Sequence, residues 1–230
     1  MRPCRRRFFA LMGLTITAAM TLTAGAATAK RMESKIIFAD DVTTAEIGSA
    51  ETPLGDYVAD AIRSASGADI AFIAASSFAS DARVSRNVTA DGVIKSLEYK
   101  DDSIVIVNLT GSQITRAMEH GLYLYPKANS GFLQFSGLNV TANPDGDKDK
   151  KVVSIRVGGA SLEAGKTYKV AMPAPLANGA LAYFRIWTKD NIDQASVGRL
   201  AQTTLQVAIE NYAKDHKNLT KGDDRLVKGR

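Results

Sequence analysis

The chain has very few of the side chains on which most hydrolytic sites depend, with one cysteine and two histidines among its 230 residues. Cys4 lies at the extreme N-terminus, so the rest of the chain has neither a disulfide nor a thiol. His120 and His216 belong to no His-x-x-x-His or Asp-x-His pattern, whereas metal-dependent hydrolases bring several such ligands together. The residues therefore predict no metal site, no cofactor and no catalytic residue.

A strong excess of one charge is also absent once the N-terminus is set aside. The chain has 29 Lys and Arg against 24 Asp and Glu, but four of the arginines and none of the acids lie in residues 1–29. The remainder has 25 basic and 24 acidic residues, which is a net charge of +1. We therefore expect no nucleic-acid partner, because nucleic-acid binding needs a basic surface.

Residues 1–29 have the pattern of an export signal. Arginines precede an apolar stretch at residues 8–22, and "ATA" at residues 27–29 suits cleavage before Lys30. The "RRRFF" of residues 5–9 fits both a twin-arginine signal and a plain secretory signal, and a membrane anchor is the alternative. The sequence predicts an exported protein, periplasmic or secreted, that has no membrane contact after cleavage.

Hydrophobic periodicity predicts one α+β domain over residues 30–213, with a mixed β-sheet covered by helices. Residues 214–230 are polar and are predicted to form a flexible tail. Strands are expected at 35–42, 70–73, 103–109, 131–142, 151–159 and 167–172, and helices at 53–66, 89–97, 110–121 and 197–212. Thr110 and Gln113 have the spacing of a capping box at one of these helix starts.

The segment "IAFIAASSF" at residues 70–78 changes from a buried strand to small residues. Ligands bind just beyond the ends of buried strands in sheets that helices cover, and small residues let a ligand approach the backbone. Ser76 and Ser77 are the first hydroxyls in this position. The pattern indicates a ligand site here, with no charge until Asp81.

Several segments in order resemble the C-terminal domain of the 5′-nucleotidase and UDP-sugar hydrolase family. They are "ETPLGDYVADAIRSASGADIAFI", "IVIVNLTGSQITRAMEHGL", "SGFLQFSGLNV" and "GGASLEAGKTYKVAM", within residues 51–187. The resemblance implies a domain that holds the nucleotide, while a preceding metallophosphatase domain with two metals cleaves the ester. Only residues 30–50 separate the predicted signal from Glu51, so we expect the binding half without its catalytic half.

The resemblance also implies which binding side chains this chain lacks. The substrate-contacting arginine of the family falls on Ala79, and its first stacking phenylalanine falls on Lys100, beside Tyr99. The second stacking ring falls on Pro175, and the acid of the Gly-Gly-Asp-Gly-Tyr motif that follows it falls on Leu181. Gly179, Tyr183 and the Ser130-Gly131 pair are kept. Because stacking and charged hydrogen bonds are each worth about 1–3 kcal/mol, these losses predict a changed ligand.

The candidate ligand-binding residues are Ser76, Ser77, Tyr99, Lys100, Asp102, Gly131, Asn178 and Gly179. The first hypothesis is an exported, non-catalytic binding module for a small polar or nucleotide-like ligand. The second is an accessory subunit for a separate metallophosphatase partner, and the third is a hydrolase of nucleotide catabolism.

Overall fold

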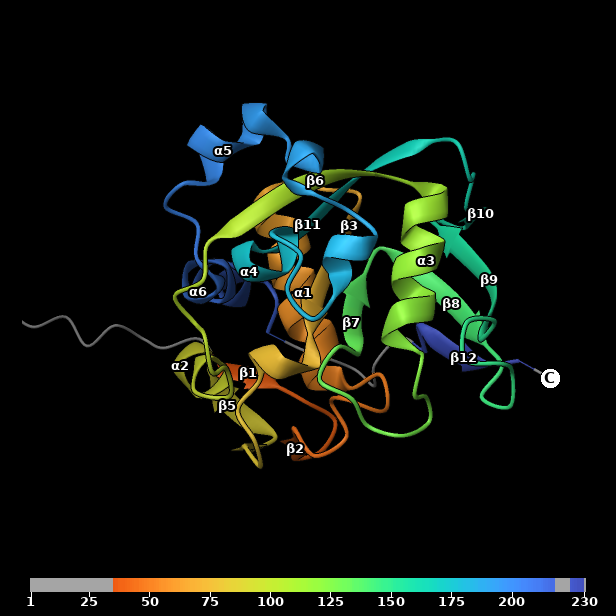
Figure 1. Ribbon diagram of the computed structural model, residues 1–230. Helices are drawn as coiled ribbons and strands as arrows, with labels where there is room; N and C mark the ends of the chain where they lie inside the picture. Colours follow the sequence, from red (N-terminus) through yellow and green to blue (C-terminus); the bar gives the residue numbers. More distant parts are fainter. Residues whose placement is uncertain (1–34, 218–223, 230) are drawn as a thin grey trace, which may run out of the picture. The chain divides into compact units, whose positions relative to one another are not determined.

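The computed structural model describes residues 35–217 and 224–229 (Figure 1). The predicted signal peptide, residues 1–29, lies outside the described residues. Among the residues that are described, no helix has both the length and the apolar content needed to cross a membrane.

A four-stranded mixed sheet forms the centre of the domain, in the order β6 (Ile104–Thr110), β11 (Thr167–Pro173), β3 (Ile70–Ala74) and β7 (Leu133–Ser136). β11 pairs in parallel with β3, whereas the two outer pairings are antiparallel. All five residues of β3 are buried, so both faces of this strand are covered. The predicted α+β class with a mixed sheet is confirmed.

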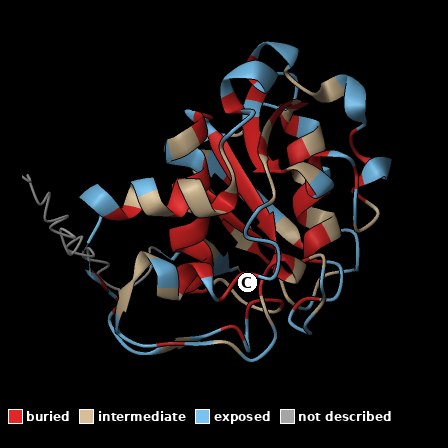
Figure 2. Ribbon diagram, turned by 90° about the vertical axis from the view of Figure 1, so that its left-hand side faces the viewer, coloured by how far each residue is buried: buried red, intermediate tan, exposed pale blue. Residues whose placement is uncertain are grey.

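Two long helices start and end where the sequence indicated. α1 (Pro53–Ser66) begins at Thr52, whose hydroxyl accepts from the Gly55 amide, and ends at Gly67 with φ of 68°. α3 (Gly111–Gly121) begins with the predicted capping box of Thr110 and Gln113. α1 packs on β3, β7 and α6 (Leu205–Asp215), and α3 packs on β6. Figure 2 shows buried residues along the central strands and the inner faces of these helices.

A second sheet follows directly from the first. β7 ends at Ser136, Gly137 turns with φ of 82°, and β8 (Leu138–Ala142) continues into a sheet of order β10-β9-β8-β12. A Cβ at position 137 would lie 2.2 Å from the Asp69 carbonyl oxygen, so this turn requires glycine. The other strands are β9 (Val152–Val157), β10 (Ala160–Ser161) and β12 (Leu226–Lys228).

Two short ribbons and several short helices complete the domain. The predicted strand at 35–42 is instead two strands, β1 (Lys35–Ile37) and β2 (Val42–Thr43), separated by a bend. β1 pairs with β5 (Asn87–Thr89), and β2 pairs with β4 (Arg83–Val84). The remaining helices are α2 (Ala90–Ile94), α4 (Ala174–Ala177), α5 (Gln194–Leu200) and the 3-10 turns Ala75–Ser77, Tyr183–Arg185 and Lys189–Asn191.

The single helix predicted over residues 197–212 is wrong, because the segment forms α5 and α6. The Thr204 hydroxyl accepts from the Val207 amide and starts a new helix. The Leu205 amide donates to the Asp102 carbonyl oxygen at 3.0 Å, which ties this break to the start of β6. The tertiary contact thus divides a segment whose apolar periodicity is continuous.

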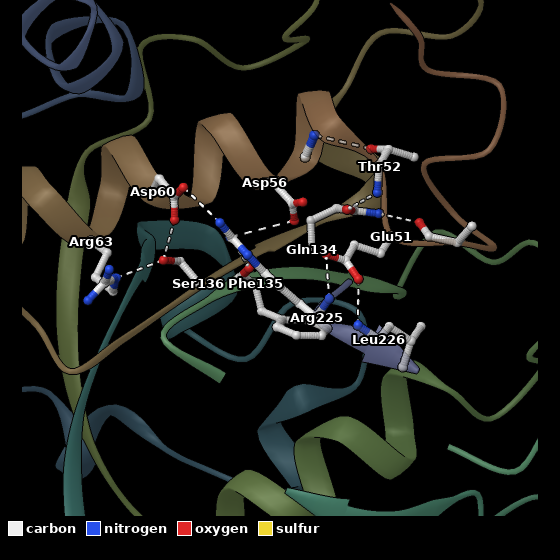
Figure 3. Close-up of polar contacts among 12 residues, drawn as sticks. Glu51, Thr52, Asp56, Asp60, Arg63, Gln134, Phe135, Ser136, Arg225 and Leu226 are labelled. Atoms are coloured by element: carbon white, nitrogen blue, oxygen red, sulfur yellow. Dashed lines mark hydrogen bonds and ion pairs between the residues drawn. The ribbon is translucent and has the colours of Figure 1, made fainter. Parts of the chain in front are cut away.

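The prediction of a flexible tail at residues 214–230 is wrong for residues 224–229. β12 pairs in parallel with β8, and Arg225 is only 8% exposed. Its Nη2 donates to Asp60 Oδ2 at 2.8 Å and its Nη1 to the Phe135 carbonyl oxygen at 2.9 Å (Figure 3). The segment is polar in composition, but carboxylates of the domain compensate its buried charge.

Asp56, one turn before Asp60 on α1, lies in the same cluster and is 3% exposed. Burial, and then the negative charge of Glu51, raise the pKa of Asp56 to about 9, although Arg225 acts in the opposite direction. Burial also raises the pKa of Glu51, against the opposing effect of its contacts with Arg225 and Leu226. Asp56 is therefore the carboxyl that keeps its proton at neutral pH.

This pKa predicts that Asp56 makes the protein less stable as the pH rises. The folded state holds the proton up to about pH 9, whereas the unfolded chain releases it near pH 3.9, so stability is lost between these values. Asp56→Asn is expected to remove this loss. In urea unfolding, the free energy of unfolding should decrease less between about pH 5 and about pH 8 for Asp56→Asn than for the wild type.

Asp60→Asn is the matched control, because it removes the partner of Arg225 Nη2 and should destabilise the protein at both pH values. Equal pH dependence of the wild type and Asp56→Asn would contradict the assignment of the proton to Asp56.

Candidate functional site

Four loops meet at one edge of the central sheet. Because β3 and β11 are parallel, their carboxyl ends at Ala74 and Pro173 lie at the same edge. β6 and β7 are antiparallel to these strands and begin at this edge, after Asp102 and Gly131 respectively. Connections at the carboxyl ends of parallel strands form the usual position of a ligand site (Figure 1).

A pocket of about 280 Å³ lies at this edge. Its polar residues are Ser76, Ser77, Tyr99 and Asp102. The rest of its wall is apolar and consists of Ala74, Pro173, Pro175, Leu176, Ala180 and Leu181. A mostly apolar wall with a few polar groups is typical of a small-molecule site.

A second hollow of about 550 Å³ lies next to this pocket and shares Ser76 and Tyr99 with it. Its other walls come from residues 44, 45, 47, 48, 75, 78–80, 98 and 128–130. Tyr99 is 55% exposed and lines both spaces, so its ring has room on the pocket side for a ligand.

Four of the eight predicted site residues lie together in the pocket, namely Ser76, Ser77, Tyr99 and Asp102. Lys100 does not line the pocket. Its Nζ lies 3.0 Å from both carboxylate oxygens of Asp101 and 3.3 Å from Gln206 Oε1. The lysine that the sequence placed at the stacking position therefore belongs to a surface ion pair.

The other predicted residues hold the backbone around the pocket. Asn178 Nδ2 donates to the Ala174 carbonyl oxygen at 2.8 Å, across the last turn of α4. Gly179 has φ of 90°, and a Cβ there would lie 2.7 Å from Phe184 Cβ. The Gly131 carbonyl oxygen accepts from the Tyr183 hydroxyl at 2.8 Å. Ligand contact by these three residues stays a prediction.

Asp102 carries the only carboxyl among the residues that line the 280 Å³ pocket. Burial raises the pKa of Asp102, and the neighbouring Asp101 raises it further. No arginine, lysine or histidine lines this pocket among the described residues. The site therefore presents hydroxyls, one carboxyl and apolar surface to a ligand, without a positive charge.

An aromatic stack that the sequence analysis did not find supports the residues 178–183 wall. The Tyr183 ring stacks on Trp187, with centroids 4.8 Å apart, and the edge of His120 meets Tyr183. His120 Nε2 lies 2.8 Å from the Leu181 carbonyl oxygen, so Nε2 carries a proton. Trp187 Nε1 donates to the Leu176 carbonyl oxygen at 3.0 Å. Tyr183 and Trp187 are close in the sequence, but His120 reaches this wall from a distant helix, so no local pattern predicts the full arrangement.

The same wall contains two non-glycine residues in the left-handed region, Leu181 with φ of 57° and Ala182 with φ of 68°. Such residues store backbone strain and are found most often at ligand sites. The Leu181 carbonyl is held by His120, and Tyr183 follows directly in the stack, so the surrounding contacts impose this backbone conformation.

Metal ligands are not gathered anywhere in the described residues. No group of three or more His, Cys, Asp or Glu side chains among them has an arrangement that would hold a metal ion. Three aspartates, Asp145, Asp147 and Asp149, occupy an exposed turn, where the Asp145 amide donates to Asn143 Oδ1.

Comparison with known proteins identifies a family. A family model described as the 5′-nucleotidase C-terminal domain matches residues 25–186. A curated 5′-nucleotidase of Mus musculus is 33% identical over 82 residues, which cover 32% of this chain and 14% of the mouse protein.

Solved structures share the fold. A 5′-nucleotidase precursor from Thermus thermophilus has a TM-score of 0.69 at 21% identity, over 84% of this chain and 39% of its own. A putative Staphylococcus aureus 5′-nucleotidase, solved with alpha-ketoglutarate, has a TM-score of 0.66 at 17% identity, with coverages of 84% and 40%. The Haemophilus influenzae NAD nucleotidase has a TM-score of 0.64 at 12% identity, over 86% of this chain and 38% of its own. The chain thus spans about two fifths of each of these structures.

The strain at Ala182 predicts that Ala182→Gly stabilises the protein. A left-handed alanine costs roughly 1–2 kcal/mol, and the greater freedom of glycine in the unfolded chain offsets part of the gain. We expect a net gain of about 0.5–1 kcal/mol in the free energy of unfolding, measured by urea denaturation.

Ala180→Gly, two residues earlier, has no left-handed backbone to relieve and should slightly destabilise the protein. A loss of stability in Ala182→Gly would show that position 182 is not strained.

Proposed function

Because the chain belongs to the family of 5′-nucleotidase C-terminal domains, we propose that it is an exported, non-catalytic module that binds an uncharged ring compound of the nucleoside class. The single observation that carries this proposal is the 280 Å³ pocket, which combines a partly exposed aromatic ring with one carboxyl and no cationic side chain. Export is inferred from the signal-like pattern of residues 1–29.

The charge of the pocket favours a nucleoside over a nucleotide. Phosphate groups are bound by arginine, lysine or clusters of backbone amides, which compensate their negative charge. Among the described residues that line the 280 Å³ pocket, Asp102 is the one with a carboxyl and none is cationic. The nearby Lys100 is paired with Asp101 and Gln206. A phosphate beside Asp102 would meet a like charge whenever that carboxyl is ionised.

The walls of the pocket suit a planar ring with polar edges. Tyr99 offers an aromatic face, while Pro175, Leu176 and Leu181 supply apolar contact. Ser76, Ser77 and Asp102 offer hydroxyls and a carboxyl that exchange hydrogen bonds with sugar hydroxyls or ring nitrogens. A nucleoside presents this combination, with a flat base and a neutral hydroxylated sugar.

The non-catalytic part of the proposal rests on what surrounds the two serines. A serine nucleophile needs a general base within hydrogen-bond reach. His120 is bonded to the Leu181 carbonyl, and His216 lies 3.1 Å from the Tyr212 carbonyl oxygen and stacks on the Tyr212 ring. Neither histidine lines the pocket, so neither is placed to act as a general base for Ser76 or Ser77.

A panel of nucleosides and their phosphates tests the ligand class by thermal shift and calorimetry on the purified protein. We expect at least one nucleoside to bind more tightly than its own 5′-phosphate. Tyr99→Ala should weaken that binding by about 5-fold to 150-fold, because base stacking on an aromatic ring is worth roughly 1–3 kcal/mol.

Lys100→Ala is the matched control, since it removes a neighbouring side chain that points to Asp101 and should leave the affinity unchanged. Tighter binding of the phosphate than of the nucleoside, with loss in Lys100→Ala, would overturn the nucleoside assignment. Release of phosphate from a nucleotide with added divalent metal, abolished by chelator, would instead show a hydrolase.

A further inference from the structure

The C-terminal segment, residues 224–229, lies in a groove that is separate from the pocket and shares no residue with it. We name it the arginine groove and define it by the side chains of Glu51, Asp56 and Asp60, the Phe135 carbonyl and the edge of β8. Figure 3 shows Arg225 entering it beside α1.

The groove binds the backbone of the segment as a sheet edge binds an added strand. The carboxylate oxygens of Glu51 accept the consecutive amides of Arg225 and Leu226. The Val140 amide donates to the Arg225 carbonyl oxygen at 2.6 Å, and the Gly229 amide donates to the Ala142 carbonyl oxygen at 2.8 Å. These contacts recognise an extended peptide through its main chain.

The groove also has a specific position for the arginine side chain. The guanidinium donates to Asp60 and to the Phe135 carbonyl, and Asp60 Oδ1 is held by the Ser136 hydroxyl at 2.5 Å. A planar, forked donor is needed to reach both acceptors, so lysine is a poor substitute. Arginine at the position just before β12 is therefore the specificity element.

The groove has more acceptor capacity than its present occupant uses. Two carboxyl groups, those of Asp56 and Asp60, lie beside the guanidinium, and neither carboxyl oxygen of the buried Asp56 accepts a hydrogen bond from it. Arg225 Nη1 is 3.5 Å from Asp56 Oδ1, which is longer than a normal hydrogen bond. Asp56, which is 3% exposed, is thus a buried carboxyl beside the occupant that makes no hydrogen bond to it.

Leu226 is partly buried and packs against the hydrophobic core, whereas Val227 is 47% exposed and Lys228 is exposed. The attachment therefore depends on backbone hydrogen bonds, on Arg225 and on Leu226, and an identical segment from another molecule reproduces these contacts. Such an exchange creates no new surface and loses no contact.

We propose that the arginine groove is an exchangeable peptide-docking site whose other occupant is residues 224–229 of a second copy of this chain. At low concentration the chain fills its own groove, because the linked segment has the higher effective concentration. At high concentration two copies exchange segments reciprocally and form a closed dimer.

A labelled peptide with the sequence of residues 223–230, DDRLVKGR, tests docking on the full chain carrying Arg225→Ala, whose own segment lacks the arginine. We expect saturable binding by fluorescence anisotropy. The same peptide with alanine in place of arginine should bind roughly tenfold to a hundredfold more weakly, since charge-assisted hydrogen bonds are lost. Adding Asp60→Asn to the Arg225→Ala chain should weaken binding of the arginine peptide. Equal affinity of the two peptides would overturn the proposal.

The wild-type chain provides a second test that does not depend on any variant folding. Isotope-labelled and unlabelled chains are mixed at high concentration and analysed by native mass spectrometry. We expect a dimer of mixed mass whose fraction rises with concentration and falls when excess arginine peptide is added, but not when the alanine peptide is added. A chain that stays monomeric at every concentration, or a dimer that the arginine peptide does not reduce, overturns the exchange.

Discussion

Val170 and Ala171 of β11 pair in parallel with Ile70 and Ala71 of β3, and this pairing brings together strand ends that are far apart in the sequence. β3 is buried along its whole length, so it cannot shift its register without exposing apolar side chains to water. The antiparallel neighbours β6 and β7 then have to begin where β3 and β11 end. The position of the pocket is a direct consequence of these three pairings.

In the pocket, the residues that hold the backbone are different from the residue that supplies the charge. The loop glycines and Tyr183 hold the backbone, and the stack of His120, Tyr183 and Trp187 keeps residues 181 and 182 in a strained conformation. A rigid wall keeps the shape of the pocket fixed, and backbone strain of this kind is found most often at ligand sites. The charge of the site, in contrast, comes from Asp102, whose carboxyl is partly withdrawn from water.

The arginine groove explains why the composition of the C-terminus predicts a flexible tail that the structure does not have at residues 224–229. A polar segment has too little apolar surface to fold by itself, and that reasoning is sound for an isolated chain. Arg225 nevertheless becomes buried, because Glu51, Asp56 and Asp60 had already been placed side by side by the start of α1. The order of the segment thus comes from acceptors that lie more than 160 residues earlier in the chain.

The sequence by itself determined the local elements: the buried strand at residues 70–74, the helix starts at Thr52 and Thr110, and the scarcity of metal ligands and nucleophile bases. These depend on neighbouring residues, whose capping hydrogen bonds and hydrophobic period are visible in the chain. Only the tertiary structure decided that Tyr99 and Asp102 line the pocket while Lys100 pairs with Asp101. It also divided residues 197–212 into two helices and buried Arg225. Each of these outcomes depends on contacts between distant segments, and a linear pattern carries no information about which distant partner a side chain will meet.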